Sequence, residues 1–176
     1  VYRLIAIFAQ TSTIISAEME FIKIIILSIL LSICYGIIHD MVTANLCVEY
    51  FTIGHPKVIE SESPFLLALL WGVIATWWAG LIIGVPLAVT AQIGTLPKIS
   101  AKQIIRPMLK LLAVMGTLAL LSGITGFILA KNGVINLSLY WNHGIPEAKH
   151  NVFLAAGWTH GASYLSGFIG GIVLCI

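Results

Sequence analysis

The sequence predicts an all-α polytopic membrane protein, a bundle of four transmembrane helices, and three observations lead to this fold class. Of the 176 residues, 59% are hydrophobic and 9% are charged, whereas soluble domains carry about 25% charged residues. Four apolar segments each approach or exceed the roughly 20 residues that a helix needs to cross the hydrocarbon layer. Four of the five histidines and most of the acidic residues gather in or beside two of the segments between them. The four predicted spans are 19–38, 64–92, 107–130 and 152–176.

The first span opens with Met19, Glu20 and Lys23 and then continues without a charge to Ile38. This pattern is typical of a natural start followed by a signal-anchor, and no small-residue cleavage site follows the apolar run. We therefore expect residues 1–18 to be upstream or added sequence, and residues 19–176 to form one domain.

The second span is preceded by Ser63, a favourable N-cap, and begins with Pro64, which suits the first helical position. Pro86 lies inside the same run and is expected to kink the helix near its far end, because proline removes a backbone hydrogen bond.

Before the third span, Ser100 can cap a helix that begins at Ala101. Pro107 would then bend or restart that helix at the beginning of the predicted span. The fourth span is expected to begin near Asn151.

Small residues recur along three of the spans at helical spacing, which lets neighbouring backbones approach closely. They are Gly72, Thr76, Gly80 and Gly84 in the second span, Gly116, Ala119, Gly123, Gly126 and Ala130 in the third, and Gly157, Gly161, Ser163, Gly167, Gly170 and Gly171 in the fourth. These faces predict a compact bundle, or contact with a second copy or a larger membrane complex. Trp77 and Trp78 are expected to fill gaps in the core.

Lysine and arginine set the expected orientation in the membrane. The segment between the second and third spans contains Lys98, Lys102, Arg106 and Lys110, more basic residues than the other two connections have. The positive-inside rule therefore places this segment and both termini in the cytoplasm, and the two histidine-rich segments on the non-cytoplasmic face. The lipid bilayer is the expected partner, and no basic, aromatic surface indicates nucleic acid.

The first polar segment, 39–63, starts with His39 and Asp40 and is longer than a simple turn. Its apolar side chains, such as Leu46 and Phe51, lead us to expect a folded cap over the bundle. In the second polar segment, Glu147 and His150 would share a helix face if Pro146 opens a helix.

The candidate functional residues are imidazoles and carboxylates, which suit Zn, Fe, Cu or Mn. They are His39, Asp40, Glu49, His55, His143, Glu147, His150 and His160. In the favoured hypothesis His39, His55 and His150 are metal ligands, Glu49 is a ligand or catalytic base, and Asp40 orients a ligand or takes part in catalysis. Glu147 and His143 are further candidate ligands. No spacing matches a strong metal motif, so ordinary polar residues that bond backbone and water are the alternative interpretation.

His160 lies inside the fourth predicted span, where an ionisable residue is a functional hypothesis by default. It is interpreted as an inner ligand or a proton carrier. The alternative is a neutral histidine bonded to a backbone carbonyl or to a threonine hydroxyl.

The segments YGIIHD at 35–40 and EYFTIGHP at 49–56 resemble a family of small, uncharacterised bacterial membrane proteins with four spans. The apolar run at 71–78 and the end around 160–164 add to this resemblance, which covers about residues 19–176. It implies membrane class, a bacterial source and hence the inner membrane. It implies no activity and no functional residue.

The sequence therefore favours a membrane metalloprotein, hydrolytic or redox, with its site at the non-cytoplasmic end of the bundle. A small ion or proton-coupled transporter or channel is the second hypothesis, with His160 on the path. An assembly subunit of a larger membrane complex is the third, supported by the glycine faces.

Overall fold

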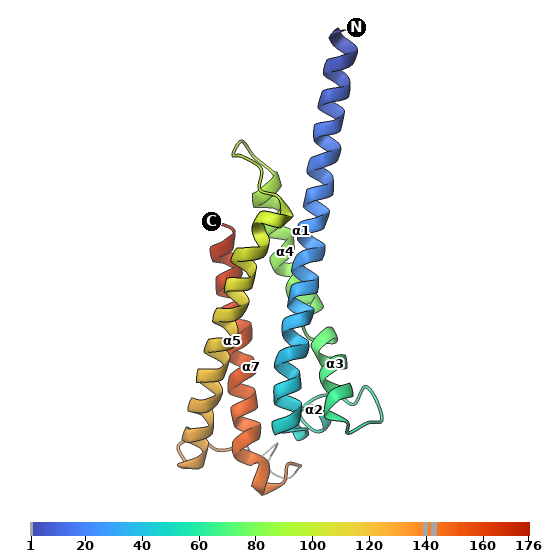
Figure 1. Cartoon of the computed structure of the whole chain (residues 1–176). Coiled ribbons are helices and arrows are strands. Elements are labelled where there is room, and N and C mark those ends of the chain that lie inside the picture. The colour runs from blue at the N-terminus through green and yellow to red at the C-terminus, as the bar shows by residue number, and fades with distance from the viewer. Residues whose placement is uncertain (1, 139–140, 142–143) are drawn as a thin grey trace.

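The computed structural model describes residues 2–138, 141 and 144–176, with side chains from residue 17 onward. Every regular element in this part of the chain is helical, which confirms the all-α part of the predicted fold class. The elements are α1 (Tyr2–Leu46), α2 (Glu49–Thr52), α3 (Pro64–Ile74), α4 (Trp77–Gln92), α5 (Ala101–Lys131), the 3-10 helix η1 (Glu147–Lys149) and α7 (His150–Leu174). The long helices run side by side along one axis (Figure 1).

Three segments of the described chain are long and apolar enough to cross a membrane: Ala17–Leu46, Pro64–Gln92 and Ala101–Lys131. They correspond to the first three predicted spans. α7 is the next longest helix, with 25 residues. Its glycines, hydroxyl groups and His160 make it less apolar than the other three.

Helix α1 continues eight residues beyond the predicted end of the first span, because it ends at Leu46 instead of residue 38. The expectation that His39 and Asp40 begin a loop is therefore wrong. No glycine or proline lies between them and Leu46. The hydroxyl of Thr43 donates to the carbonyl of His39 one turn earlier, so polar side chains here are accommodated within the helix.

The second predicted span is two helices, interrupted at Ala75 and Thr76. The start agrees with the prediction, because Ser63 accepts a hydrogen bond from the backbone of Leu66 and Pro64 follows it. The sequence placed the expected kink of this span at Pro86, which lies inside α4. The helix is instead interrupted eleven residues earlier, at Ala75.

Helix α5 begins at Ala101 as expected, with a capping box between Ser100 and Gln103. It runs through Pro107 without ending, although proline at the seventh helical position lacks the N–H that would bond the carbonyl of Gln103 one turn earlier. The fourth predicted span corresponds to α7, which begins one residue before Asn151.

Glycines bring the helices into close contact in two pairs. A Cβ atom on Gly72 of α3 would lie 2.6 Å from the Cα of Ile37 in α1, and one on Gly80 of α4 would lie 2.7 Å from the Cα of Ile29. In the other pair, Gly123 of α5 lies against Thr159 of α7. Parts of the predicted small-residue faces are therefore used within the chain, whereas Gly157 and Gly161 of α7 would meet nothing within 4 Å.

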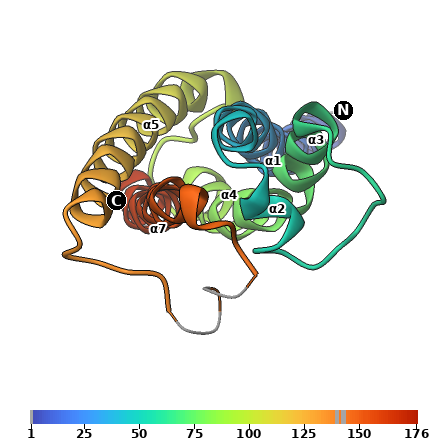
Figure 2. The same ribbon diagram turned by 90° about the horizontal axis from the view of Figure 1, so that it is seen from below.

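The bundle therefore consists of two helix pairs that meet along a seam. One pair is α1 with the interrupted helix α3–α4, and the other is α5 with α7. α1 packs chiefly against α3 and α4, while α5 packs chiefly against α7. Figure 2, which views the bundle from below, shows α7 beside α5 and α3 beside α1. Trp77 and Trp78 do not fill the core as expected, because their side chains are 47% and 43% exposed.

Candidate metal centre

Two helices from different pairs bring three ionisable side chains together at the seam. His39 and Asp40 are neighbours on α1, and His160 lies 120 residues beyond Asp40 on α7. Each residue offers one ligand atom, and these atoms all lie within 4.8 Å of one another. Asp40 is 4% exposed, so the group lies inside the protein.

The orientation of His160 is fixed by two contacts. Its Nδ1 lies 2.9 Å from the carbonyl oxygen of Ala156, one turn earlier in α7. A carbonyl oxygen can only accept, so Nδ1 carries the proton in this contact. The other ring nitrogen, Nε2, lies 3.1 Å from Oδ1 of Asp40. When Nδ1 is the only protonated ring nitrogen, Nε2 has a lone pair and faces a carboxylate oxygen, which is also an acceptor.

Two such acceptors do not attract each other unless a proton or a cation lies between them. The same arrangement is found at metal sites, where the non-ligating ring nitrogen of histidine donates to a backbone carbonyl. The contact between His160 and Ala156 fits that pattern.

His39 adds a second nitrogen that the protein leaves unpaired. Its Nδ1 lies 3.4 Å from the hydroxyl oxygen of Ser163, which in turn lies 2.7 Å from the hydroxyl of Tyr35. Its Nε2 is buried without a hydrogen-bond partner in the described structure. An unpaired buried polar atom costs about 1–3 kcal/mol, which calls for a ligand as partner.

Helix α2 covers the group with aromatic rings. The ring of Tyr50 lies 4.6 Å from the imidazole of His160, measured between centroids, and the ring of Phe51 lies 6.2 Å from it. Phe51 is buried and packs with Ala44 and Leu67, which holds α2 in place. Burial raises the pKa of Tyr50 to about 12, so its phenol is neutral.

His55 lies next to the group but is not one of its converging members. Its Nδ1 is 2.7 Å from the carbonyl oxygen of Tyr50, and its ring is 4.6 Å from that of Trp71. Burial among these rings lowers the pKa of His55, because a low-dielectric surrounding disfavours the charged imidazolium.

Glu49 lies on α2 and pairs with the chain at the start of α7. Its Oε2 is 3.7 Å from Nζ of Lys149, an ion pair that is too long for a hydrogen bond. Neighbouring Cys47 is buried, and burial raises the pKa of its thiol to about 11. The thiol therefore stays protonated at neutral pH, which disfavours Cys47 as a metal ligand.

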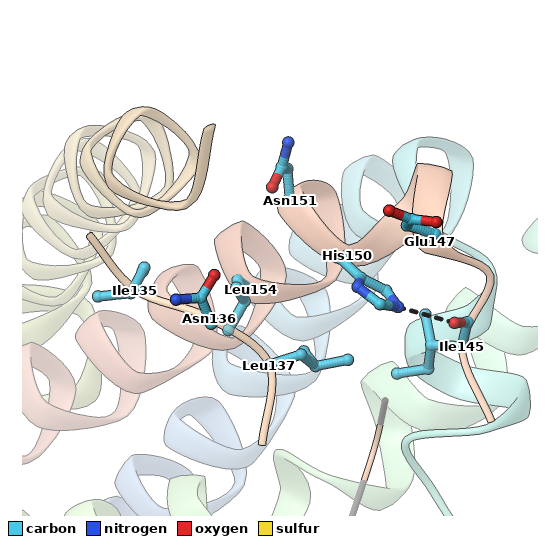
Figure 3. A pocket seen from close by; sticks show the side chains of 8 residues that line it. All are labelled: Ile135, Asn136, Leu137, Ile145, Glu147, His150, Asn151 and Leu154. Atoms are coloured by element: carbon cyan, nitrogen blue, oxygen red, sulfur yellow. Dashed lines mark hydrogen bonds between the residues drawn. The ribbon is translucent and has the colours of Figure 1, made fainter. Parts of the chain in front are cut away.

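His150 and Glu147 line a different cavity of about 640 Å³ at the end of the bundle, with Asn136 and Asn151 (Figure 3). Nε2 of His150 lies 2.8 Å from the carbonyl oxygen of Ile145. Glu147 is exposed and has no hydrogen bond or ion pair to any described residue. The candidate ligand His143 lies outside the described residues.

The structure thus joins His39, Asp40 and His160, and within the described residues it does not add His55, Glu49, Glu147 or His150 to them. Ser163 and Tyr35 complete the surroundings and were not predicted as site residues. Their spacing offered a hint, since Tyr35 is four residues before His39 and Ser163 is three after His160, each on the same helix face as its neighbour.

The chain matches no protein-family model, no curated protein and no solved structure.

Proposed function

We propose that this protein is an integral membrane metalloprotein that binds one divalent transition metal ion through His39, Asp40 and His160. The observation that carries the proposal is the geometry of His160, whose Nδ1 bonds the carbonyl of Ala156 while its Nε2 faces Oδ1 of Asp40 at 3.1 Å. A cation there would satisfy both atoms, and the unpaired nitrogen of His39 would be its third donor.

The donor set also indicates the kind of metal. Two imidazoles and one carboxylate are the ligands of many non-haem Fe(II) sites, and they suit Zn, Cu and Mn as well. Three protein ligands leave coordination positions open for water or a substrate, as in catalytic sites. When bound, such a metal can polarise a substrate oxygen, generate hydroxide or exchange electrons.

The surrounding residues would prepare the site before the metal binds. Ala156 fixes the tautomer and direction of His160, and Ser163 holds the other nitrogen of His39. Tyr50 and Phe51 cover the imidazole of His160 and keep water away from it. Ligands held in this way bind metal more tightly, because little conformational freedom is lost.

We further propose that α7 is a fourth membrane span and that α2 with its flanking segments caps the bundle on the non-cytoplasmic side. The apolar outer face of α7 supports the first point, since Leu165, Phe168 and Ile169 are exposed. The basic residues at 98–110 support the orientation. The site would then lie within the bundle, near its non-cytoplasmic end.

Metal content tests the proposal directly. The protein would be purified without affinity-tag metal, offered Fe²⁺, Zn²⁺, Cu²⁺ or Mn²⁺ in turn, and analysed for bound metal. We expect about one ion per chain in the wild type. We expect at least a tenfold weaker affinity in His160→Ala and in Asp40→Asn, which removes the charge and keeps the shape.

His150→Ala is the matched control, because His150 has the same kind of contact to a backbone carbonyl but lies outside the group. It should bind metal like the wild type. A wild type that binds none of the four metals, or an equal loss in His150→Ala, would overturn the proposal.

A proton-carrying role is the second candidate, and one observation favours it. Tyr35, Ser163 and His39 form a chain of polar contacts that leads to Asp40 and His160. A metal-free protein that conducts protons in liposomes, and loses this conduction in Ser163→Ala, would support this role in place of the metal site.

A further inference from the structure

A cavity of about 250 Å³ adjoins the group formed by His39, Asp40 and His160. It lies between α1, α4, α5 and α7, at the seam of the two helix pairs. At one end it is polar, lined by the three ionisable residues together with Tyr35 and Ser163. The rest is lined by apolar side chains such as Ile83, Met108, Leu111, Leu112 and Met115.

The cavity reaches the outer surface between α4 and α7. The rings of Trp78 on α4 and Tyr164 on α7 stack across the two helices, with centroids 6.0 Å apart. Next to them, Ile82 of α4 and Phe168 of α7 line the cavity and are 51% and 58% exposed. Side chains that belong both to a cavity and to the lipid-facing surface mark its mouth.

Contacts between α4 and α7 close the seam on both sides of this mouth. On one side, the hydroxyl of Tyr164 donates to the carbonyl of Ala75 at 3.0 Å. This carbonyl lies at the interruption between α3 and α4. On the other side, Gly171 lies against Ile83. The mouth of the cavity therefore lies between these two contacts and opens toward the apolar layer of the membrane.

The lining decides the charge of a ligand. Among the described residues no lysine or arginine lines the cavity, and the carboxylate of Asp40 lies at its polar end. While no metal ion is bound, an anionic head would be repelled there and would lack a counter-ion in a low-dielectric surrounding. A neutral head with a hydroxyl or carbonyl oxygen can instead hydrogen-bond with Tyr35 or Ser163, while its apolar body contacts the methionine and leucine side chains.

We propose that this cavity binds a neutral amphiphile from the bilayer, which enters between α4 and α7 and places an alcohol or carbonyl oxygen beside His39, Asp40 and His160. The inference deepens the proposed function and rests on it, because it names the substrate class of the metal site. Binding itself needs only the cavity, so the two can be tested apart.

The test uses photo-crosslinking of the full chain in lipid nanodiscs. The probe is a dodecyl alcohol with a diazirine in its chain, and the matching diazirine-bearing dodecanoate is the anionic comparison. Crosslinked positions are mapped by peptide mass spectrometry. In protein stripped of metal with a chelator, we expect saturable labelling of the cavity-lining residues of α4, α5 and α7 by the alcohol, and at least tenfold less by the carboxylate at pH 8.

Two variants make the result specific. Ala79 lines the cavity, so Ala79→Phe should fill it and abolish the saturable labelling. Ala113 is exposed on α5 and does not line the cavity, so Ala113→Phe should leave labelling unchanged. Thermal unfolding of both variants verifies that they are folded.

Metal content is measured on the same preparations before the chelator is added. Bound metal without saturable alcohol labelling, or equal labelling of the metal-free protein by the carboxylate, overturns the ligand inference and leaves the metal proposal standing. Saturable labelling of a protein that binds no metal supports the cavity as a binding site and overturns the metal proposal.

Discussion

Asp40 is the residue on which the candidate site depends most. It is buried, next in sequence to one histidine and 3.1 Å from another. A carboxylate in this position needs a positive partner. No lysine or arginine pairs with it in the described structure. The requirement for a cation therefore comes from His39, Asp40 and His160 together.

Residues of the same type have different roles because their surroundings differ. His160 and His150 each bond a backbone carbonyl with one ring nitrogen. The other nitrogen of His160 faces a buried carboxylate, whereas His150 lines a cavity with Glu147 and two asparagines. The sequence shows two histidines near α7 and does not show this difference.

His55 gives a prediction about pH. Burial lowers its pKa from the ordinary value of 6.5, so the folded state binds its proton less readily than the unfolded state. Its contribution to stability is complete above about pH 6.5 and falls as the pH drops from there toward the lowered pKa. We expect the wild type to lose thermal stability between pH 7.5 and pH 5, by at most about 1.4 kcal/mol per pH unit for this one proton.

The control is His55→Gln, which keeps a polar side chain and does not titrate. Its unfolding midpoint, followed by circular dichroism in detergent, should fall less steeply over the same range. If both proteins lose stability in parallel, the imidazole of His55 does not cause the loss.

Among the helices, several ends are set by tertiary contacts more than by the local sequence. Pro64 and Ser100 marked two helix starts correctly, because capping is a local interaction. The extension of α1 to Leu46 was not predicted. Its last turns pack Ala44 against Phe51 and Leu67, so tertiary contacts support a helix that polar residues alone did not indicate.

The interruption between α3 and α4 is a second case. Neither a glycine nor a proline lies at Ala75 and Thr76. In an apolar layer the freed carbonyl of Ala75 needs an internal donor, and the hydroxyl of Tyr164 on α7 supplies it. The partner lies 89 residues away in sequence, which is why no local pattern could locate the break.

Two glycines provide a matched test of the packing. A Cβ on Gly72 would meet the backbone of Ile37 at 2.6 Å, whereas one on Gly157 would meet nothing within 4 Å. Gly72→Ala should lower the free energy of unfolding by about 1–3 kcal/mol through overpacking. Gly157→Ala should leave it equal or higher, because alanine favours the helix by up to about 1 kcal/mol.

Thermal or denaturant unfolding in the same detergent measures both variants. Equal stability of the two would show that α1 and α3 do not approach as closely at Gly72 as the structure places them.

The whole molecule is organised by the seam between its two helix pairs. Within each pair, glycines allow close contact. Across the seam contacts are fewer. Ile24 and Leu87 pack there with Met108 in an apolar cluster, and polar contacts join Tyr35 to Ser163 and Asp40 to His160. A metal ion or a ligand there would join the two pairs, so its binding should also raise the stability of the protein.

Orientation in the membrane is tested with two exposed lysines. Lys57 lies between α2 and α3, and Lys98 lies between α4 and α5. In a background without Cys34, Cys47 and Cys175, Lys57→Cys should react with a membrane-impermeant maleimide from outside intact cells. Lys98→Cys should react only after permeabilisation, because the basic segment is expected in the cytoplasm. The reverse pattern would invert the proposed orientation.

The sequence by itself determined the all-helical class, the first three apolar segments, the caps at Ser63 and Ser100, and His160 as an unusual residue within an apolar run. These follow from local rules, since hydropathy, capping and helical spacing are properties of neighbouring residues.

Only the tertiary structure decided which imidazoles meet. It joined His39 and Asp40 to His160 and placed His55 and His150 elsewhere. The reason is physical: the seam is set by glycine contacts within each helix pair and by a helix break that Tyr164 stabilises. Such contacts join residues far apart in the chain, and a single sequence does not record their distances.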